Sequence, residues 1–150
     1  MTLPEQERER FCQVLHHSRT SLYRLAFSIT RNSSDAQEAV AEAVCRAYER
    51  YPQLREKEKL PRWLLKITAN EARRLCQRRG RTVSLDDLPT EPAIPGRETG
   101  DDTLWQAVQT LPRDQREAVV LFYYEDLPTE EIARIVGTSP GAVRVRLSRA

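Results

Sequence analysis

The residues best suited to chemistry stand near the end of the chain, where arginines recur at helical spacing. Arg144, Ser148 and Arg149 share one outward side with the apolar Val145. Arginine can bond both acceptors of a guanine edge, and arginine and serine can both donate to phosphate oxygens. These residue types and their spacing indicate binding of nucleic acid.

A second set of polar residues lies near the middle of the chain. Lys66, Asn70, Arg73 and Gln77 recur at steps of four, three and four, which places them on one side of a helix. Between residues 65 and 82, six basic side chains outnumber a single glutamate, although the whole chain carries a net charge of only +2. Local charge of this kind suits a phosphate-binding surface. An ordinary solvated basic face is the alternative interpretation.

An acidic stripe precedes the basic one and lies opposite an apolar face. Its members are Asp35, Glu38, Glu42, Arg46 and Glu49. Taken alone, the stripe is typical of a surface that faces water, because no histidine stands near it and the cysteines of the chain have no metal-ligand spacing. The sequence has no phosphate-binding glycine loop and no nucleophile elbow. We therefore expect a protein that is not an enzyme and that needs no metal or other cofactor.

Composition and cysteine usage favour a cytoplasmic protein. Cys12, Cys45 and Cys76 are widely spaced and fall in helical patterns, so we expect buried or idle thiols. No early apolar run resembles a signal peptide, and no stretch approaches the length needed to span a membrane. Hydrophobic residues make up 39% of the chain and charged residues 31%, which suits well-solvated helices.

The elements that position these side chains are predicted to be helices. Apolar residues recur with helical period in stretches 5–17, 20–30, 35–51, 62–79, 102–110 and 113–125. Ser34 and Gln37 form a capping-box pattern before the third stretch. Prolines and glycines interrupt the chain after residue 80, which indicates a linker. We expect an all-α fold of two small helical domains, residues 1–80 and 102–150, joined by a flexible linker over 81–101.

The final segment has the pattern of a helix-turn-helix. Gly137 stands where a helix must end in the left-handed conformation, which glycine adopts at little cost. Ser139 can cap the next helix, and Pro140 fits its first turn. Val143 and Leu147 then face inward, which leaves the arginine-bearing face outward. The second helix of such a motif can enter a DNA major groove.

Two features beside the basic stripe bear on nucleic acid as well. The loop 55–62 carries Lys57, Lys59 and Arg62, which could approach a phosphate backbone. Trp63 could stack on an unpaired base. Tryptophan at the start of an amphipathic helix is more often part of a core, and we favour the core position for it.

Three groups of motifs follow one another along the chain. The first group is Leu22-Tyr-Arg-Leu-Ala26, Asp35-Ala-Gln-Glu-Ala-Val40 and Arg46-Ala-Tyr48. The second is Trp63-Leu-Leu-Lys-Ile67 with Asn70. The third is Leu111-Pro112, Arg116, residues 127–133 and Val143-Arg-Val-Arg-Leu-Ser-Arg-Ala150. In this order they resemble region two, the promoter-melting helix and region four of the extracytoplasmic-function (ECF) sigma factors, which direct bacterial RNA polymerase to promoters.

The resemblance implies roles for all three surfaces. Docking on the clamp coiled coil of the largest polymerase subunit is implied for Asp35, Glu38, Glu42 and Arg46. Binding of the minus-ten element is implied for Lys57, Lys59, Arg62, Lys66, Asn70, Arg73 and Gln77. Binding of the minus-thirty-five element is implied for Ser139, Arg144, Val145, Ser148 and Arg149. The implied partners are core RNA polymerase, promoter DNA and an anti-sigma factor.

The chain departs from the family pattern at Ala41, Arg74, Pro128 and Ala142, where glutamine, aspartate, serine and threonine are usual. Its basic run stops at Ala150, whereas in relatives it continues for another turn or more, so we expect weaker minus-thirty-five binding than from an extended version. Two other functions stay open. One is a stand-alone helix-turn-helix regulator, and the other is a protein that occupies polymerase without reading DNA.

Overall fold

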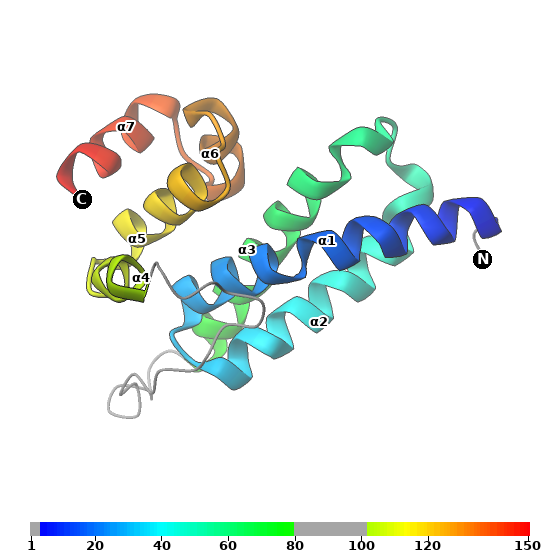
Figure 1. Cartoon of the computed structure of the whole chain (residues 1–150), viewed down its shortest axis with the longest axis horizontal. Coiled ribbons are helices and arrows are strands. Elements are labelled where there is room, and N and C mark those ends of the chain that lie inside the picture. The colour runs from blue at the N-terminus through cyan, green and yellow to red at the C-terminus, as the bar shows by residue number, and fades with distance from the viewer. Residues whose placement is uncertain (1–3, 80–101) are drawn as a thin grey trace.

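The structure is a computed structural model that describes residues 4–79 and 102–150, so the predicted linker at 81–101 falls outside the described residues. Figure 1 shows α1, α2 and α3 together in one bundle, with α4 to α7 gathered beside it. We call residues 4–79 the first lobe and residues 102–150 the second lobe. The predicted all-α class with two helical parts is confirmed.

The helices have the following bounds. In the first lobe, α1 spans Glu5–Thr30, α2 spans Ser33–Arg50 and α3 spans Leu60–Arg79, with short 3-10 turns at Tyr51–Gln53 and Lys57–Lys59. In the second lobe, α4 spans Asp102–Gln109, α5 spans Arg113–Val119, α6 spans Thr129–Val136 and α7 spans Pro140–Arg149.

Helix α1 is one continuous helix of 26 residues, so the two separate helices predicted for 5–17 and 20–30 were wrong. The segment contains no glycine or proline, and nothing in it forces the helical hydrogen bonds to stop. The helix ends at Arg31, which adopts the left-handed conformation with φ 55° and donates its N–H to the Phe27 carbonyl at 2.8 Å.

Helix α2 starts earlier than predicted. The Asn32 side chain accepts a hydrogen bond from the Asp35 N–H at 2.9 Å and caps the helix at Ser33. The predicted capping box of Ser34 and Gln37 was therefore wrong, because Ser34 already lies within the first turn. Helix α3 likewise begins two residues before its predicted start, and it ends at Arg79 as predicted.

The first lobe packs its three helices around one apolar core. Helix α2 faces the core with alanines, which let its neighbours approach closely. The fully buried residues include Leu22, Leu25, Ala36, Ala43, Ala47, Leu60 and Leu64. At one end, the Phe11 ring meets Tyr48 and Tyr51 edge-on, with centroids 5.4 Å and 5.3 Å apart. Trp63 is half-buried and packs on this core, as favoured from the sequence.

In the second lobe, α5 and a π-helical turn at Val120–Tyr124 pack against the helix-turn-helix. Val120 and Leu121 are fully buried, which confirms the apolar helix predicted for 113–125. After Asp126, which adopts φ 55°, the chain enters α6. Helices α6 and α7 then form the predicted motif, and Val143 of α7 is fully buried between its neighbours.

The turn between α6 and α7 has the predicted geometry. Gly137 adopts φ 79° and donates its N–H to the Ala133 carbonyl at 2.9 Å, and Thr138 donates to the same carbonyl at 3.0 Å. Ser139 caps α7 by accepting the Ala142 N–H at 3.1 Å, and Pro140 opens the helix. The positive φ at Gly137 therefore fixes the angle at which α7 leaves α6.

Gly137→Ala is expected to destabilise the chain by about 1–2 kcal/mol, because a side chain in the left-handed region is strained. Nothing lies within 4 Å of an added Cβ, so the cost is conformational and not a clash. Gly141→Ala is the control, because its Cβ would meet only the Ser139 Oγ at 4.0 Å in a regular helix. Urea unfolding should show a loss for the first variant and no loss for the second; equal stabilities would contradict the role of the turn.

The two lobes are packed against each other. Helix α5 contacts α1, and α6 contacts α3. Trp105 of α4 reaches Phe27 of α1, with ring centroids 6.4 Å apart, and both side chains are buried. The apolar core therefore runs through both lobes without interruption.

Candidate functional site

The outward face of α7 carries the residues predicted to read DNA. Arg144, Val145, Ser148 and Arg149 are all exposed, and Val145 keeps 47% of its surface accessible. An exposed apolar side chain beside two arginines suits binding in the DNA major groove. There Val145 could contact the methyl group of a thymine. Ser139 already accepts the capping hydrogen bond, so only its hydroxyl proton is available to a phosphate.

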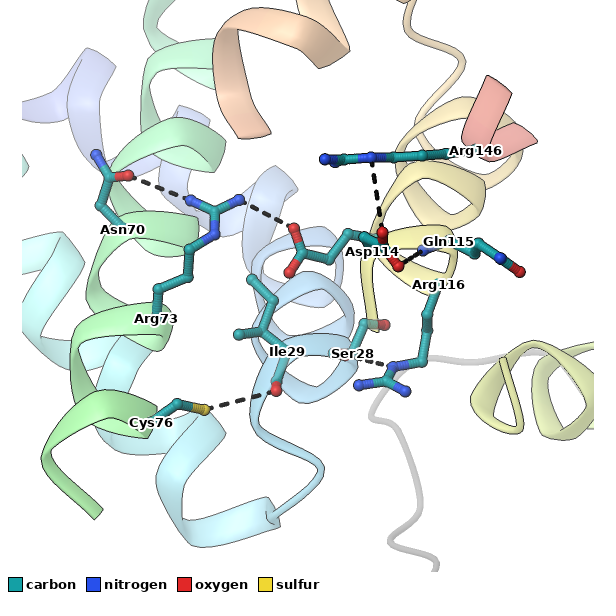
Figure 2. Close-up of polar contacts among 10 residues, drawn as sticks. Ser28, Ile29, Asn70, Arg73, Cys76, Asp114, Gln115, Arg116 and Arg146 are labelled. Carbon is teal, nitrogen blue, oxygen red and sulfur yellow. Dashed lines mark hydrogen bonds and ion pairs between the residues drawn. The ribbon is translucent and has the colours of Figure 1, made fainter. Parts of the chain in front are cut away.

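One arginine of α7 points elsewhere. The Arg146 Nε lies 3.9 Å from the Asp114 carboxylate of α5, and its side chain is only 26% exposed. Figure 2 shows Arg146 reaching toward Asp114. Arg146 therefore faces the scaffold of its own lobe, and Arg144 and Arg149 face outward.

On α3, three of the four residues of the basic stripe are exposed, namely Lys66, Asn70 and Gln77. The fourth, Arg73, forms hydrogen bonds to one residue of α3 and one residue of α5. Its Nη1 donates to the Asn70 Oδ1 at 3.4 Å, and its Nη2 donates to the Glu117 Oε1 of α5 at 2.9 Å. Figure 2 shows Arg73 reaching from α3 toward α5. The predicted stripe is thus present, with Arg73 held by the other lobe.

The loop before α3 divides its basic residues between two roles. Lys57 Nζ donates to the Tyr51 carbonyl at 2.8 Å and to the Leu54 carbonyl at 2.7 Å, and it lies 4.5 Å from the Tyr51 ring centroid. Lys59 is exposed, and its contact is an ion pair of 2.8 Å with the equally exposed Glu56. Lys57 therefore closes the loop, while Lys59 is presented on it.

Lys57→Met is expected to lower the free energy of unfolding by about 1–3 kcal/mol, because two hydrogen bonds from a charged donor are lost. Methionine preserves the apolar stem beside Tyr51. The matched change Lys59→Met removes an exposed pair worth about 0.2–1 kcal/mol at most. If the loop contacts DNA phosphates, as the sequence predicts, Lys59→Met should reduce the salt dependence of DNA binding by about one unit of log–log slope, and Lys57→Met should leave it unchanged. A loss of salt dependence in Lys57→Met at unchanged stability would contradict this division.

The acidic stripe of α2 is only partly as predicted. Glu38 and Glu42 are exposed, but Asp35 keeps only 8% of its surface accessible, so its predicted place on the water-facing stripe was wrong. Asp35 shares a helix face with Ala39, four residues later, and that face is buried. Arg46 lies between the stripe and α3, with its Nε 2.8 Å from the Glu71 carboxylate and 3.6 Å from that of Glu42.

The three cysteines lie in different environments. Cys12 and Cys45 are exposed, whereas Cys76 is half-buried and donates to the Ile29 carbonyl at 3.6 Å. Burial raises the pKa of the Cys76 thiol, and Arg113 of α5 partly opposes that shift.

Across residues 4–79 and 102–150, no cluster of three or more histidine, cysteine or acidic side chains could hold a metal ion. None of the helices described is long and apolar enough to cross a membrane.

Comparisons with known proteins match both lobes. Residues 14–82 match the family described as sigma-70 region 2, and residues 101–150 match sigma-70 region 4. RNA polymerase sigma factor SigV of Bacillus subtilis is 33% identical over 130 residues, which cover 85% of this chain and 78% of SigV. ECF RNA polymerase sigma factor SigE of Mycolicibacterium smegmatis is 30% identical over 139 residues, covering 85% of this chain and 53% of SigE.

A solved structure is similar across both lobes. It is sigma factor RpoE of Bartonella quintana in complex with the anti-sigma factor NepR. The match has a TM-score of 0.77 at 26% sequence identity, and it covers 94% of this chain and 91% of RpoE. Coverage of this extent includes the helices of both lobes.

Proposed function

Because the chain belongs to the RNA polymerase sigma factors of the ECF type, we propose that its two lobes divide promoter recognition between them. Sigma factors bind core RNA polymerase and direct it to promoters, and they are not enzymes. The proposal assigns the minus-thirty-five element to α7, the minus-ten element to α3 with its preceding loop, and polymerase to α2. What supports it is the separation of two basic surfaces and one acidic surface on different helices.

The second lobe would read the minus-thirty-five element as a duplex. Helix α7 exposes Arg144 and Arg149 on one side, and Val143 anchors the opposite side in the core. A helix held in this way can enter the major groove, where base pairs differ in their donors and acceptors. Bidentate contacts from arginine to guanine would supply specificity, and contacts to phosphates would supply affinity.

The first lobe would capture the minus-ten element as an opened strand. Unstacking a base costs a few kcal/mol, and a protein can offset this by binding the exposed base edge. The exposed Asn70 amide offers its N–H donors, while its oxygen accepts a hydrogen bond from Arg73 at 3.4 Å. Lys66, four residues earlier on α3, and Lys59, in the preceding loop, are both exposed and would hold phosphates. The exposed carboxylates of Glu38 and Glu42 would meet a basic surface of the polymerase.

Two further assignments follow from these partners. An anti-sigma factor is proposed as the regulator, since the similar RpoE structure holds one. A cytoplasmic location is proposed because core polymerase and promoter DNA are located there. Both rest on the family and its structural neighbour.

Changing Lys66 and Asn70 together to alanine should slow promoter opening in the reconstituted holoenzyme by roughly tenfold, since a base contact and a phosphate contact are both lost. Fluorescence of 2-aminopurine placed in the minus-ten element reports the unstacking directly. Glu9→Ala on the exposed part of α1 is the control. Unstacking at the wild-type rate in the double variant would exclude α3 as the minus-ten surface.

A further inference from the structure

Val145 is an exposed apolar side chain among the arginines of α7. It keeps 47% of its surface accessible, whereas Val143 on the opposite side of the helix is fully buried. At 3.6 residues per turn, Val145 lies between Arg144 and Arg149, which are both exposed. Packing against the core therefore does not explain an apolar residue at this position, and contact with a partner of the outward face would.

The surroundings of Val145 leave its methyl groups accessible to such a partner. Side chains on a helix lean toward its N-terminus, so Val145 leans over Gly141, four residues earlier. A Cβ added to Gly141 would meet the Ser139 Oγ at 4.0 Å and no nearer atom. The absence of a side chain at Gly141 thus leaves space in which a base edge can approach Val145.

The chemistry of valine limits what this contact can read. Valine has no hydrogen-bond donor or acceptor, so Val145 cannot distinguish the O4 acceptor of thymine from the N4 donor of cytosine. The apolar feature of the major groove is the methyl group on C5 of a pyrimidine. Valine in a helix has one strongly preferred χ1 rotamer, so little side-chain entropy is lost when such a contact forms.

We infer that Val145 reads the C5-methyl group of one pyrimidine in the minus-thirty-five element, whichever base carries that group. This inference rests on the proposed function of α7. Thymine and 5-methylcytosine both offer the methyl group to Val145, whereas uracil and unmethylated cytosine do not. Where a cytosine stands at this position of a promoter, binding by this chain therefore depends on methylation of that cytosine.

The expected effect is modest and specific. Burial of one methyl-sized group changes affinity about fourfold, which is less than the loss of a bidentate contact from arginine to guanine. The arginines of α7 then supply most of the affinity for the element. Val145 adjusts the preference among elements that the arginines already accept.

The test uses the reconstituted holoenzyme and a labelled promoter duplex that it transcribes. Each thymine of the upstream element, on either strand, is replaced singly by uracil, which keeps the base pair and the O4 acceptor and removes only the methyl group. Fluorescence anisotropy should show one position at which uracil raises Kd about fourfold. At that position, a pair of 5-methylcytosine with guanine should bind about fourfold more tightly than the unmethylated pair.

The variant Val145→Ser assigns the effect to this side chain. Serine and valine have similar helix propensities, so α7 should be retained, and circular dichroism checks this. Both ratios, thymine to uracil and 5-methylcytosine to cytosine, should fall to about one in this variant. The matched control is Leu104→Ser on α4, where an apolar side chain is 52% exposed, and it should keep the wild-type ratios.

Two results would overturn the inference alone. One is binding that depends on the upstream element and on Arg144 and Arg149 but is the same with uracil at every thymine. The other is an unchanged preference for the methyl group in Val145→Ser, because the methyl group would then act through DNA shape. Failure of the proposed function is distinguishable, since a holoenzyme insensitive both to the upstream element and to loss of the two arginines would refute the role of α7 itself.

Discussion

Reversing two charges on α2, with Glu38→Lys and Glu42→Lys together, is expected to abolish assembly with core RNA polymerase under conditions where the wild type assembles. Both carboxylates are exposed, and Glu42 keeps 54% of its side chain accessible. Placing like charges opposite each other costs several kcal/mol, and each 1.4 kcal/mol raises Kd tenfold. We expect Kd to rise about 100-fold or more, as measured by fluorescence anisotropy of labelled chain titrated with core enzyme.

The control for this experiment is Glu9→Lys, which makes the same charge reversal at an exposed position of α1. It should bind core polymerase like the wild type. Helical content by circular dichroism should be unchanged in both variants, because none of the three side chains is buried. Wild-type assembly by the α2 variant would show that polymerase docks on another surface.

Removing the outward arginines of α7, with Arg144→Ala and Arg149→Ala together, should lower initiation that depends on the minus-thirty-five element while core binding persists. A bidentate contact from arginine to guanine is worth about 1–3 kcal/mol, so two lost contacts predict a fall of roughly 30-fold or more. Run-off transcription on promoters with and without that element measures the effect. Core binding should be unaffected because these groups lie on the lobe opposite α2.

Arg146→Ala is the matched control on the same helix. Its guanidinium faces Asp114 of the scaffold at 3.9 Å, and its loss should change initiation only slightly. If Arg146→Ala impairs initiation as strongly as the outward pair, then α7 does not present the face assigned to it. If the outward pair disrupts core binding, the roles of the two lobes have been exchanged.

The helices and the turn could be predicted because their signals are local. The αL glycine at position 137, the capping serine at 139 and the buried Val143 lie within seven residues of one another, and their conformations are set by steric preferences and capping. The exposed stripe of Lys66, Asn70 and Gln77 followed equally from helical spacing. Features with a period of a few residues were therefore accessible from the sequence.

The contacts between lobes could not be predicted in this way. Arg24 and Glu125 are 101 residues apart in sequence, and Arg73 and Glu117 are 44 apart. Helical periodicity identifies an arginine as lying on the surface of its helix. It does not distinguish an arginine that pairs with the other lobe from one that faces water. Asp35 illustrates the same limit, because a carboxylate in a first helical turn can lie on either side of the boundary between core and solvent.

Reconstitution with core RNA polymerase on a randomised promoter library, scored by transcription, tests the division of promoter recognition most directly. The two-lobe account predicts transcripts from promoters that share two elements at fixed spacing. Dependence on the upstream element should be lost with Arg144→Ala/Arg149→Ala, and dependence on the downstream element with Lys66→Ala/Asn70→Ala. No transcription from any promoter, with duplex binding retained by the chain alone, would contradict the account and identify a DNA-binding protein that works without polymerase.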